Sequence, residues 1–300
     1  MSTIEALNGE FGISGELNFS THASGLTVVE IHNQQASAAI SVQGAHLMSW
    51  QPSGEKAVIW TSPSAKLGSG KSMRGGIPVC WPWFGDHAAN ADYPAHGFVR
   101  MQLWKVVGSS TLENGETQIT FEFERNETSK TYWPHATSLR YVITVGKTLQ
   151  LELQTINNSA QDIEISEALH TYFNVSDVRN ISIEGLNNCD YLDKTDGFKR
   201  KHQTGMISFA GEVDRVYLNT ESDCVLVDPG MARKIRIEKR GSLSTVVWNP
   251  WIEKSQRMGD MGENGYLHIA CIESGNAADN KIKLAPGAAH TLWVNYALED

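Results

Sequence analysis

An imidazole and a carboxylate, His170 and Glu273, stand where each could exchange a proton with a bound substrate. His170 closes the alternating segment 163–170, and by that alternation it faces away from Leu169. Glu273 follows the apolar segment 266–272, and a carboxylate beside such neighbours needs a partner or a solvated pocket. Together the two residue types suit general acid–base catalysis. Taken singly, each favours a structural role: a packed, hydrogen-bonded histidine and a strand-end glutamate turned toward water.

Two arginines, Arg74 and Arg100, are the residues best suited to bind an anionic group. A guanidinium offers a planar fork of donors and stays charged at any relevant pH, so it can bind a phosphate at two points. Arg74 also lies in the segment 56–85, which contains Lys and Arg but no Asp or Glu. This segment predicts a local basic pocket for a small anion, although a solvated basic loop, or surface ion pairs, would explain it as well.

Three other residues beside turns or strand starts are candidates for binding a sugar. His96 lies four residues before Arg100 and is followed by a glycine. Asp214 stands at the start of a predicted strand. Trp83 lies in a loop rich in Gly, Pro and Trp, where an indole ring either stacks on the apolar face of a sugar or anchors the core. None of the three is specific alone, and surface ion pairing is the alternative for the charged residues.

The sequence lacks the motifs of most other chemistries. Its ten histidines form no H-x-H or H-E-x-x-H pattern and its four cysteines form no C-x-x-C pair, so we expect neither a metal site nor a redox dithiol. No G-x-S-x-G nucleophile motif occurs, and the Gly-Lys-Ser tripeptide at 70–72 lacks the earlier glycine of a phosphate-binding loop. We therefore predict chemistry without a metal or cofactor.

Composition restricts the partners and the compartment. The net charge of −9 argues against nucleic acid, because binding to a phosphate backbone needs a large basic surface. No signal peptide is recognisable, and no stretch approaches the ~20 apolar residues of a membrane span. These observations predict a cytoplasmic protein with a small-molecule ligand and no nucleic-acid or membrane partner. The oligomeric state is left open by the sequence, with a monomer favoured.

Strict alternation of apolar and polar residues dominates the chain. It occurs over residues 119–124, 149–154, 163–166, 181–184, 235–238 and 292–296. Such alternation is typical of half-buried strands, whereas long helical periodicity is nearly absent. No linker or fixed-period repeat divides the chain. We predict one all-β, mainly antiparallel domain over 1–300, a large β-sandwich in which 1–24 is an N-terminal extension or the first strand.

Six short motifs occur in an order that resembles a known family. They are Arg74–Pro78 with Trp81–Gly85, His96–Arg100, His170–Asn174, Asp214–Tyr217, Trp248–Trp251 and Glu273–Asn276. In this order they resemble the hexose-6-phosphate mutarotases, or glucose-6-phosphate 1-epimerases, of the galactose-mutarotase-like superfamily, and the resemblance spans residues 25 to 298. It implies a large antiparallel β-sandwich that acts without a metal.

The same resemblance assigns roles to individual residues. It implies that His170 is the general acid and Glu273 the general base, with sugar contacts from His96 and Asp214. Phosphate or sugar contacts would come from Arg74 and Arg100. The substrate partner implied is therefore a phosphorylated sugar, whose anomers the enzyme would interconvert.

Anomers interconvert through the open-chain aldehyde, which requires a base for the C1 hydroxyl and an acid for the ring oxygen. We expect ionised Glu273 and protonated His170 to fill these roles, with nearby carboxylates such as Asp214 raising the pKa of the imidazole. Two alternatives remain, an aldose 1-epimerase for free hexoses and a non-catalytic carbohydrate-binding sandwich. The basic segment disfavours the first, and the presence of both an acid and a base disfavours the second.

Overall fold

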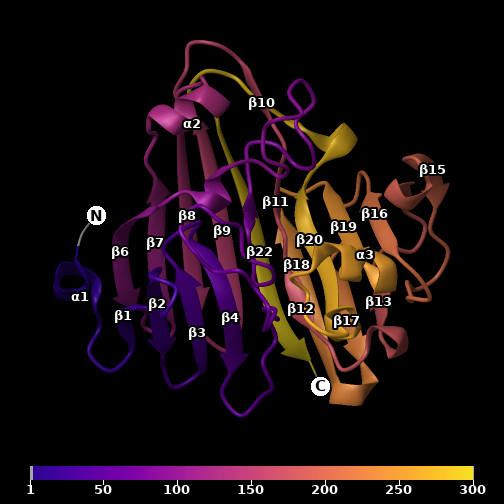
Figure 1. Ribbon diagram of the computed structural model, residues 1–300, viewed down its shortest axis with the longest axis horizontal. Helices are drawn as coiled ribbons and strands as arrows, with labels where there is room; N and C mark the ends of the chain where they lie inside the picture. Colours follow the sequence, from indigo (N-terminus) through magenta and orange to yellow (C-terminus); the bar gives the residue numbers. More distant parts are fainter. Residues whose placement is uncertain (1–2, 300) are drawn as a thin grey trace.

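Period-two alternation produces a long antiparallel sheet in the computed structural model, which describes residues 3–299 (Figure 1). Within β9, Leu149, Leu151 and Leu153 are fully buried, while Glu152 between them is exposed. The strands of this sheet, in spatial order, are β13 (Ser182–Glu184), β17 (Cys224–Asp228), β18 (Arg233–Arg240), β22 (Ala289–Glu299), β9 (Thr148–Asn157), β8 (Thr137–Val145), β7 (Thr117–Phe123) and β6 (Lys105–Thr111). All six segments of strict alternation fall in or beside strands, as predicted.

A second layer covers this sheet and is made of two further antiparallel sheets. The first joins β15 (Lys199–His202), β14 (Asp190–Asp193), β16 (Val213–Tyr217), β19 (Ser244–Asn249), β20 (Ile269–Asn276), β11 (Glu167–Leu169) and β5 (Val79–Cys80), with β12 (Tyr172–Asn174) also pairing with β20. The second joins β1 (Leu17–Thr21), β2 (Thr27–His32), β3 (Ala36–Ser41) and β4 (His46–Pro52). A small pair joins β10 (Ile163–Ile165) to β21 (Ile282–Leu284).

The layers enclose one hydrophobic core. Contact between β3 and β8 places the four-stranded sheet against the long sheet, and Figure 1 shows β1–β4 over β6–β9. Val29, Leu151 and Ile272, one from each of the three large sheets, belong to the same buried cluster. The arrangement is the predicted β-sandwich. The shared core supports our proposal that the chain forms a single domain.

Helices are short and peripheral among the described residues. They are α1 (Ile4–Phe11), α2 (Glu127–Tyr132) and α3 (Trp251–Met258), with 3-10 turns at Val99–Met101, Val178–Asn180, Lys194–Asp196, Pro229–Met231, Gly265–His268 and Ala278–Asn280. The N-terminal segment contains both α1 and the first strand β1, and α1 begins where the Thr3 hydroxyl accepts a hydrogen bond from the Ala6 amide. Within residues 3–299, no helix combines the length and apolar character needed to cross a bilayer.

Two strand boundaries near the candidate residues were predicted wrongly. The segment 163–170 is not one strand, because Ser166 leaves the ladder: its amide donates to the Pro82 carbonyl and its hydroxyl accepts from the Phe84 amide. Strand β20 begins later and ends later than expected, so Glu273 lies within it instead of after its end. The carboxylate is consequently buried and does not turn toward water.

Strand β20 explains why an apolar run precedes Glu273. Ala270 and Ile272 pack into the core between the layers, whereas Cys271 belongs to a separate buried cluster on the outer face. Because successive side chains alternate between faces, Glu273 shares the outer face with Cys271. Both faces of β20 are covered, which favours apolar residues on both.

Candidate active site

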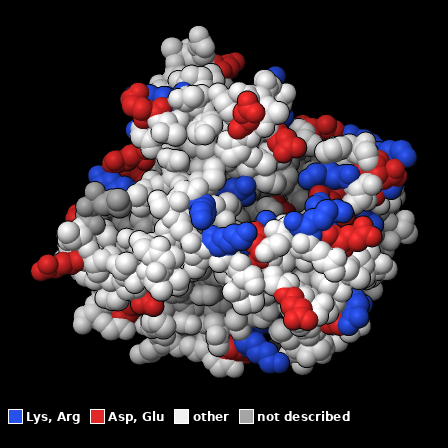
Figure 2. Space-filling model, in the orientation of Figure 1, with Lys and Arg blue, Asp and Glu red and all other residues white. Residues whose placement is uncertain are grey.

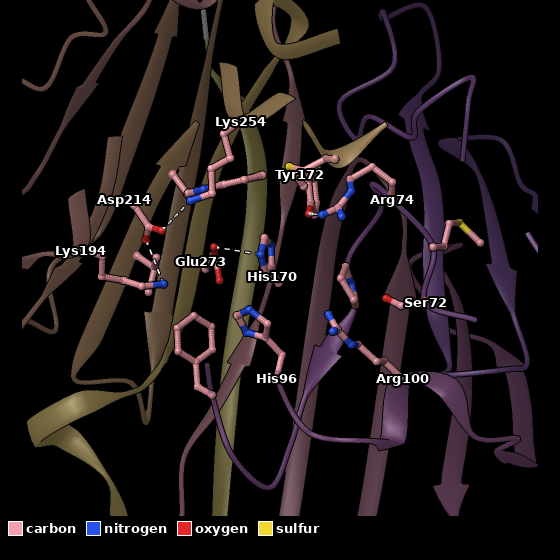
Figure 3. A pocket seen from close by; sticks show the side chains of 16 residues that line it. Ser72, Arg74, His96, Arg100, His170, Tyr172, Lys194, Asp214, Lys254 and Glu273 are labelled. Carbon is pink, nitrogen blue, oxygen red and sulfur yellow. Dashed lines mark hydrogen bonds and ion pairs between the residues drawn. The ribbon is translucent and has the colours of Figure 1, made fainter. Parts of the chain in front are cut away.

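A cavity of about 330 Å³ opens on the outer face of the β15–β5 sheet. This volume is within the range of small-molecule sites. Figure 2 shows basic side chains around a hollow in the face presented, and Figure 3 shows the cavity from close by. The lining comprises Ser72, Met73, Arg74, Pro78, Phe84, His96, Arg100, His170, Tyr172, Lys194, Asp214, Val246, Trp248, Lys254, Met258 and Glu273.

Strand register brings distant parts of the chain together on the cavity floor. Tyr172 pairs with Cys271, Cys271 with Trp248, and Trp248 with Asp214, which makes one row across four strands. Glu273 lies two residues beyond Cys271 on the same face, one step along the strand from this row. Antiparallel pairing therefore brings together residues as far apart in the sequence as Tyr172 and Glu273, which are separated by 101 positions.

A tight loop delivers His96 to the cavity. His96 and Gly97 both have left-handed backbones, with φ of 63° and 72°. A Cβ at position 97 would lie 1.9 Å from the Trp81 carbonyl oxygen, so only glycine fits. The His96 ring meets the His170 ring edge-on at 5.6 Å, and its Nδ1 accepts from the Gly85 amide, which leaves Nε2 as a donor. Burial and the Arg100 charge lower the pKa of His96 to about 3, so this ring is neutral.

His170 and Glu273 face each other at the centre of the cavity (Figure 3). The imidazole Nε2 lies 3.4 Å from the carboxylate Oε1, and the two side chains are 10% and 1% exposed. His170 stacks on the Tyr172 ring, with centroids 4.8 Å apart and an interplanar angle of 9°. Nδ1 of His170 and Oε2 of Glu273 are buried without a hydrogen-bond partner among the described residues. The pair therefore has unsatisfied polar atoms beside an open cavity.

The protonation states differ from the sequence-based expectation. Burial, followed by the influence of His96, Arg100 and Arg74, lowers the pKa of His170 well below its ordinary value. Burial and the nearby Asp214 carboxylate raise the pKa of Glu273 well above its own. These shifts favour a neutral imidazole beside a protonated carboxyl, not an imidazolium beside a carboxylate. The expectation considered neighbouring carboxylates but not desolvation or the two arginines.

Arg100 differs from the other three cations of the cavity in having no acidic partner within ion-pair distance among residues 3–299. Arg74 pairs with Asp260 at 3.0 Å, Lys194 with Asp214 at 3.2 Å and Lys254 with Glu212 at 2.7 Å. Arg100 donates to the Ala95 carbonyl, and its Nε is buried without a partner. An incoming anion would thus find uncompensated positive charge at Arg100.

Six of the seven residues selected from the sequence line this cavity: Arg74, His96, Arg100, His170, Asp214 and Glu273. Trp83 is not among the lining residues. Its ring packs against Tyr93 and Phe98, and its Nε1 donates to the Pro94 carbonyl, so it anchors the core. Of the cations in the basic segment 56–85, Arg74 alone lines the cavity.

Four prominent lining residues received no functional role from the sequence: Tyr172, Lys194, Trp248 and Lys254, of which Tyr172 and Trp248 lie in motifs that carry the family resemblance. Tyr172 was detectable, because it follows His170 by two positions and alternation can place both on one face. Lys194 lies in a 3-10 turn and Lys254 on α3, in charged segments that resemble ordinary surface. No local signal distinguishes these lysines from solvated ones.

Comparison with known proteins places the chain in a family. The sequence profile of the family described as aldose 1-epimerase matches residues 27–297. The chain belongs to the aldose 1-epimerase family. This placement confirms the isomerase activity predicted from the sequence, and together with the relatives described next it confirms the predicted resemblance and fold class.

Individual relatives agree with this placement. A protein of Escherichia coli K12 provisionally named glucose-6-phosphate 1-epimerase is 37% identical over 266 residues, covering 88% of each chain. The crystal structure of a provisionally named mutarotase from Salmonella typhimurium superimposes with a TM-score of 0.90, at 33% identity over 97% of this chain and 96% of that one. A galactose mutarotase-like protein from Clostridium acetobutylicum shares the fold, with a TM-score of 0.75 at 14% identity over 95% and 98% of the two chains.

Proposed function

We propose that this epimerase interconverts the α and β anomers of a hexose 6-phosphate, most simply glucose 6-phosphate, with His170 and Glu273 as its proton-transfer pair. The observation that carries the proposal is the 3.4 Å approach of Nε2 to Oε1 on a cavity floor, between walls that carry four cations. The name of the Escherichia coli relative supports the choice of substrate. His96 and Asp214 are proposed to bind sugar hydroxyls.

The reaction needs one acid and one base at a time. To open the ring, the base removes the C1 hydroxyl proton, electrons form the aldehyde carbonyl, and the acid protonates the ring oxygen as its bond to C1 breaks. After rotation about C1–C2, the two groups exchange roles, and closure on the other face returns both to their starting states. The pKa directions make the Glu273 carboxyl the initial acid and the neutral His170 the initial base.

Phosphate recognition is proposed for the wall formed by Arg74 and Arg100. Arg100 has uncompensated charge, and a phosphate dianion that reaches it replaces lost hydration with charge-assisted hydrogen bonds. A free hexose would use the same proton-transfer pair but leave this charge unmatched. An epimerase for free hexoses is therefore the second candidate, and the two differ in how much they depend on Arg100.

We propose further that the enzyme acts as a cytoplasmic monomer. Cys80, Cys224 and Cys271 are free and buried, which suits a reducing compartment. Light scattering of the purified protein at several concentrations checks the monomer, and a concentration-dependent dimer mass would contradict it.

Exchange NMR of the two anomers tests the substrate assignment. Wild-type protein is compared on glucose 6-phosphate and glucose with a chelator present, beside Arg100→Ala and the surface control Arg179→Ala. Loss of charge-assisted hydrogen bonds is expected to raise KM for glucose 6-phosphate by about 10- to 100-fold in Arg100→Ala, with little change for glucose. Equal effects on both substrates would remove phosphate from the proposal, and loss of activity with the chelator would implicate a metal.

A further inference from the structure

Tyr172 connects the phosphate wall of the cavity to the imidazole of His170. Its hydroxyl accepts a hydrogen bond from Arg74 Nη1 at 3.0 Å, and its ring lies nearly parallel to the His170 ring at 4.8 Å. The side chain is 2% exposed, so neither contact is diluted by solvent. Figure 3 shows Tyr172 between Arg74 and His170.

Arg74 retains donors for a ligand although two of its nitrogens are engaged. Nε donates to Asp260 Oδ1 at 3.0 Å and Nη1 donates to Tyr172. A guanidinium has five N–H donors, and the part of the chain from 3 to 299 provides no acceptor for Nη2. Because Arg74 lines the cavity beside Ser72 and Arg100, a phosphoryl oxygen can bind this remaining edge.

A phosphoryl group bound there would complete a rigid series of contacts. Asp260 fixes one edge of the guanidinium, the phosphoryl group fixes another, and Tyr172 is held at the third position. The stacked phenol in turn fixes the plane of the imidazole whose Nε2 faces Glu273. Without the phosphoryl group, Asp260 and Tyr172 alone restrain the guanidinium and its Nη2 edge is not held, so Tyr172 and the His170 ring stacked on it are positioned less firmly.

We propose that Tyr172 is a positioning residue that transmits occupancy of the phosphate position at Arg74 to His170, so that a 6-phosphate raises kcat and not only affinity. This inference rests on the proposed function. Its physical basis is that binding energy from a remote, unreactive part of a substrate can orient the groups at the reacting centre. Small misplacements of a proton-transfer group have large effects on rate.

The test separates the hydroxyl of Tyr172 from its ring. Tyr172→Phe keeps the stack on His170 and removes the bond to Arg74. The matched control is Tyr217→Phe, which removes a buried phenol hydroxyl bonded to Gln203 at 2.8 Å, outside the cavity lining. Asp260→Ala removes the other hydrogen bond of Arg74, and it replaces Tyr172→Phe in the test if that variant does not fold. Values of kcat and KM are measured by anomer exchange for glucose 6-phosphate and for glucose, the latter with and without inorganic phosphate.

We expect kcat on glucose 6-phosphate to fall about tenfold in Tyr172→Phe, the size of a lost hydrogen bond to a charged group, and kcat on glucose without phosphate to fall several-fold less. Inorganic phosphate should accelerate glucose exchange by wild type and Tyr217→Phe but not by Tyr172→Phe. An equal fall in kcat on both substrates, or no fall on either, would overturn the inference. If the wild type itself fails to exchange glucose 6-phosphate, the proposed function fails instead.

Discussion

The molecule contains two histidine–glutamate pairs, each with one partner in the chain segment 167–170. In the cavity, His170 Nε2 lies 3.4 Å from Glu273 Oε1; between the sheets, His290 Nε2 lies 3.0 Å from Glu167 Oε1. Glu167 precedes His170 by three residues, and Asn276, which donates to Glu167, follows Glu273 by three. Residues three apart on a strand face opposite sides, so these segments present His170 and Glu273 toward the cavity and Glu167 with Asn276 toward the other layer, where His290 of β22 meets Glu167.

The surroundings of the two pairs decide what each can do. The inner pair joins β11 to β22 of the other layer, and Asn276 donates to Glu167 Oε1 at 3.4 Å, so the inner pair fastens the layers together. The cavity pair faces open space lined by Arg74 and Arg100, and two of its polar atoms lack partners among the described residues. Glu167 Oε2 of the inner pair is also buried without a partner among the described residues, so unsatisfied atoms do not separate the pairs. The comparison teaches that residue type alone does not make a proton-transfer site; access to a substrate does.

The largest expected difference is kinetic. His170→Gln should lower the rate of anomer exchange by about 10²- to 10⁴-fold, because glutamine cannot take or give the proton. The matched variant His290→Gln makes the same change in the inner pair and should stay within about twofold of wild type, since it touches no cavity residue. Steady-state exchange rates at saturating substrate are measured for both variants and for wild type. Similar losses in both variants would mean that His170 acts only through the fold.

A second expected difference concerns stability, for which the inner pair should matter more than the cavity pair. Glu167→Gln should lower the free energy of unfolding by about 1–3 kcal/mol, because it weakens hydrogen bonds between charged or polar partners that join the layers. Glu273→Gln should leave stability unchanged or raise it, because the buried Glu273 carboxyl must take up a proton on folding at neutral pH, whereas glutamine is neutral in both states. Urea titrations compare the variants, and equal destabilisation by both would contradict this distinction.

A smaller effect is the pH dependence of stability contributed by the cavity pair. Below the ordinary His value of 6.5, the unfolded chain binds a proton that folded His170 does not, so the contribution of His170 to stability is lost as pH falls. Above the ordinary Glu value of 4.5, folded Glu273 keeps a proton that the unfolded chain releases, so its contribution is lost as pH rises.

Urea titrations across this pH range measure both slopes. The stability of wild type relative to His170→Gln should decrease from pH 6.5 downward, and that relative to Glu273→Gln should decrease from pH 4.5 upward. A wild-type stability advantage over His170→Gln that grows on acidification would show that the imidazole is held in its charged form.

The sequence predicted the strands well where only local alternation mattered. Strands such as β9 and β18 read directly from the periodic burial of one face. Boundaries failed where a tertiary contact replaced the ladder, as at Ser166, whose amide bonds to the Pro82 carbonyl instead of a neighbouring strand. Helix α1 escaped notice because eight residues are too few for a clear helical period.

The site was predictable only in part, for a related reason. His170 and Glu273 were found because their residue types suit proton transfer and their motifs resemble a family, whereas the equally paired Glu167 and His290 attracted no attention. The position of the cavity beside one pair and not the other depends on the register of strands about a hundred residues apart. A local sequence pattern contains no information about that register. The lysines on the cavity wall, Lys194 and Lys254, were missed because their segments look like ordinary solvated surface.

The most direct measurement compares Glu273→Gln and Glu167→Gln side by side in exchange NMR with glucose 6-phosphate. If the Glu273 carboxyl carries a proton in the reaction, its variant should lose at least about 100-fold in exchange rate, while Glu167→Gln stays within about twofold of wild type. Near-normal exchange by Glu273→Gln, with both proteins folded, would contradict the assignment of the cavity pair as the acid and base.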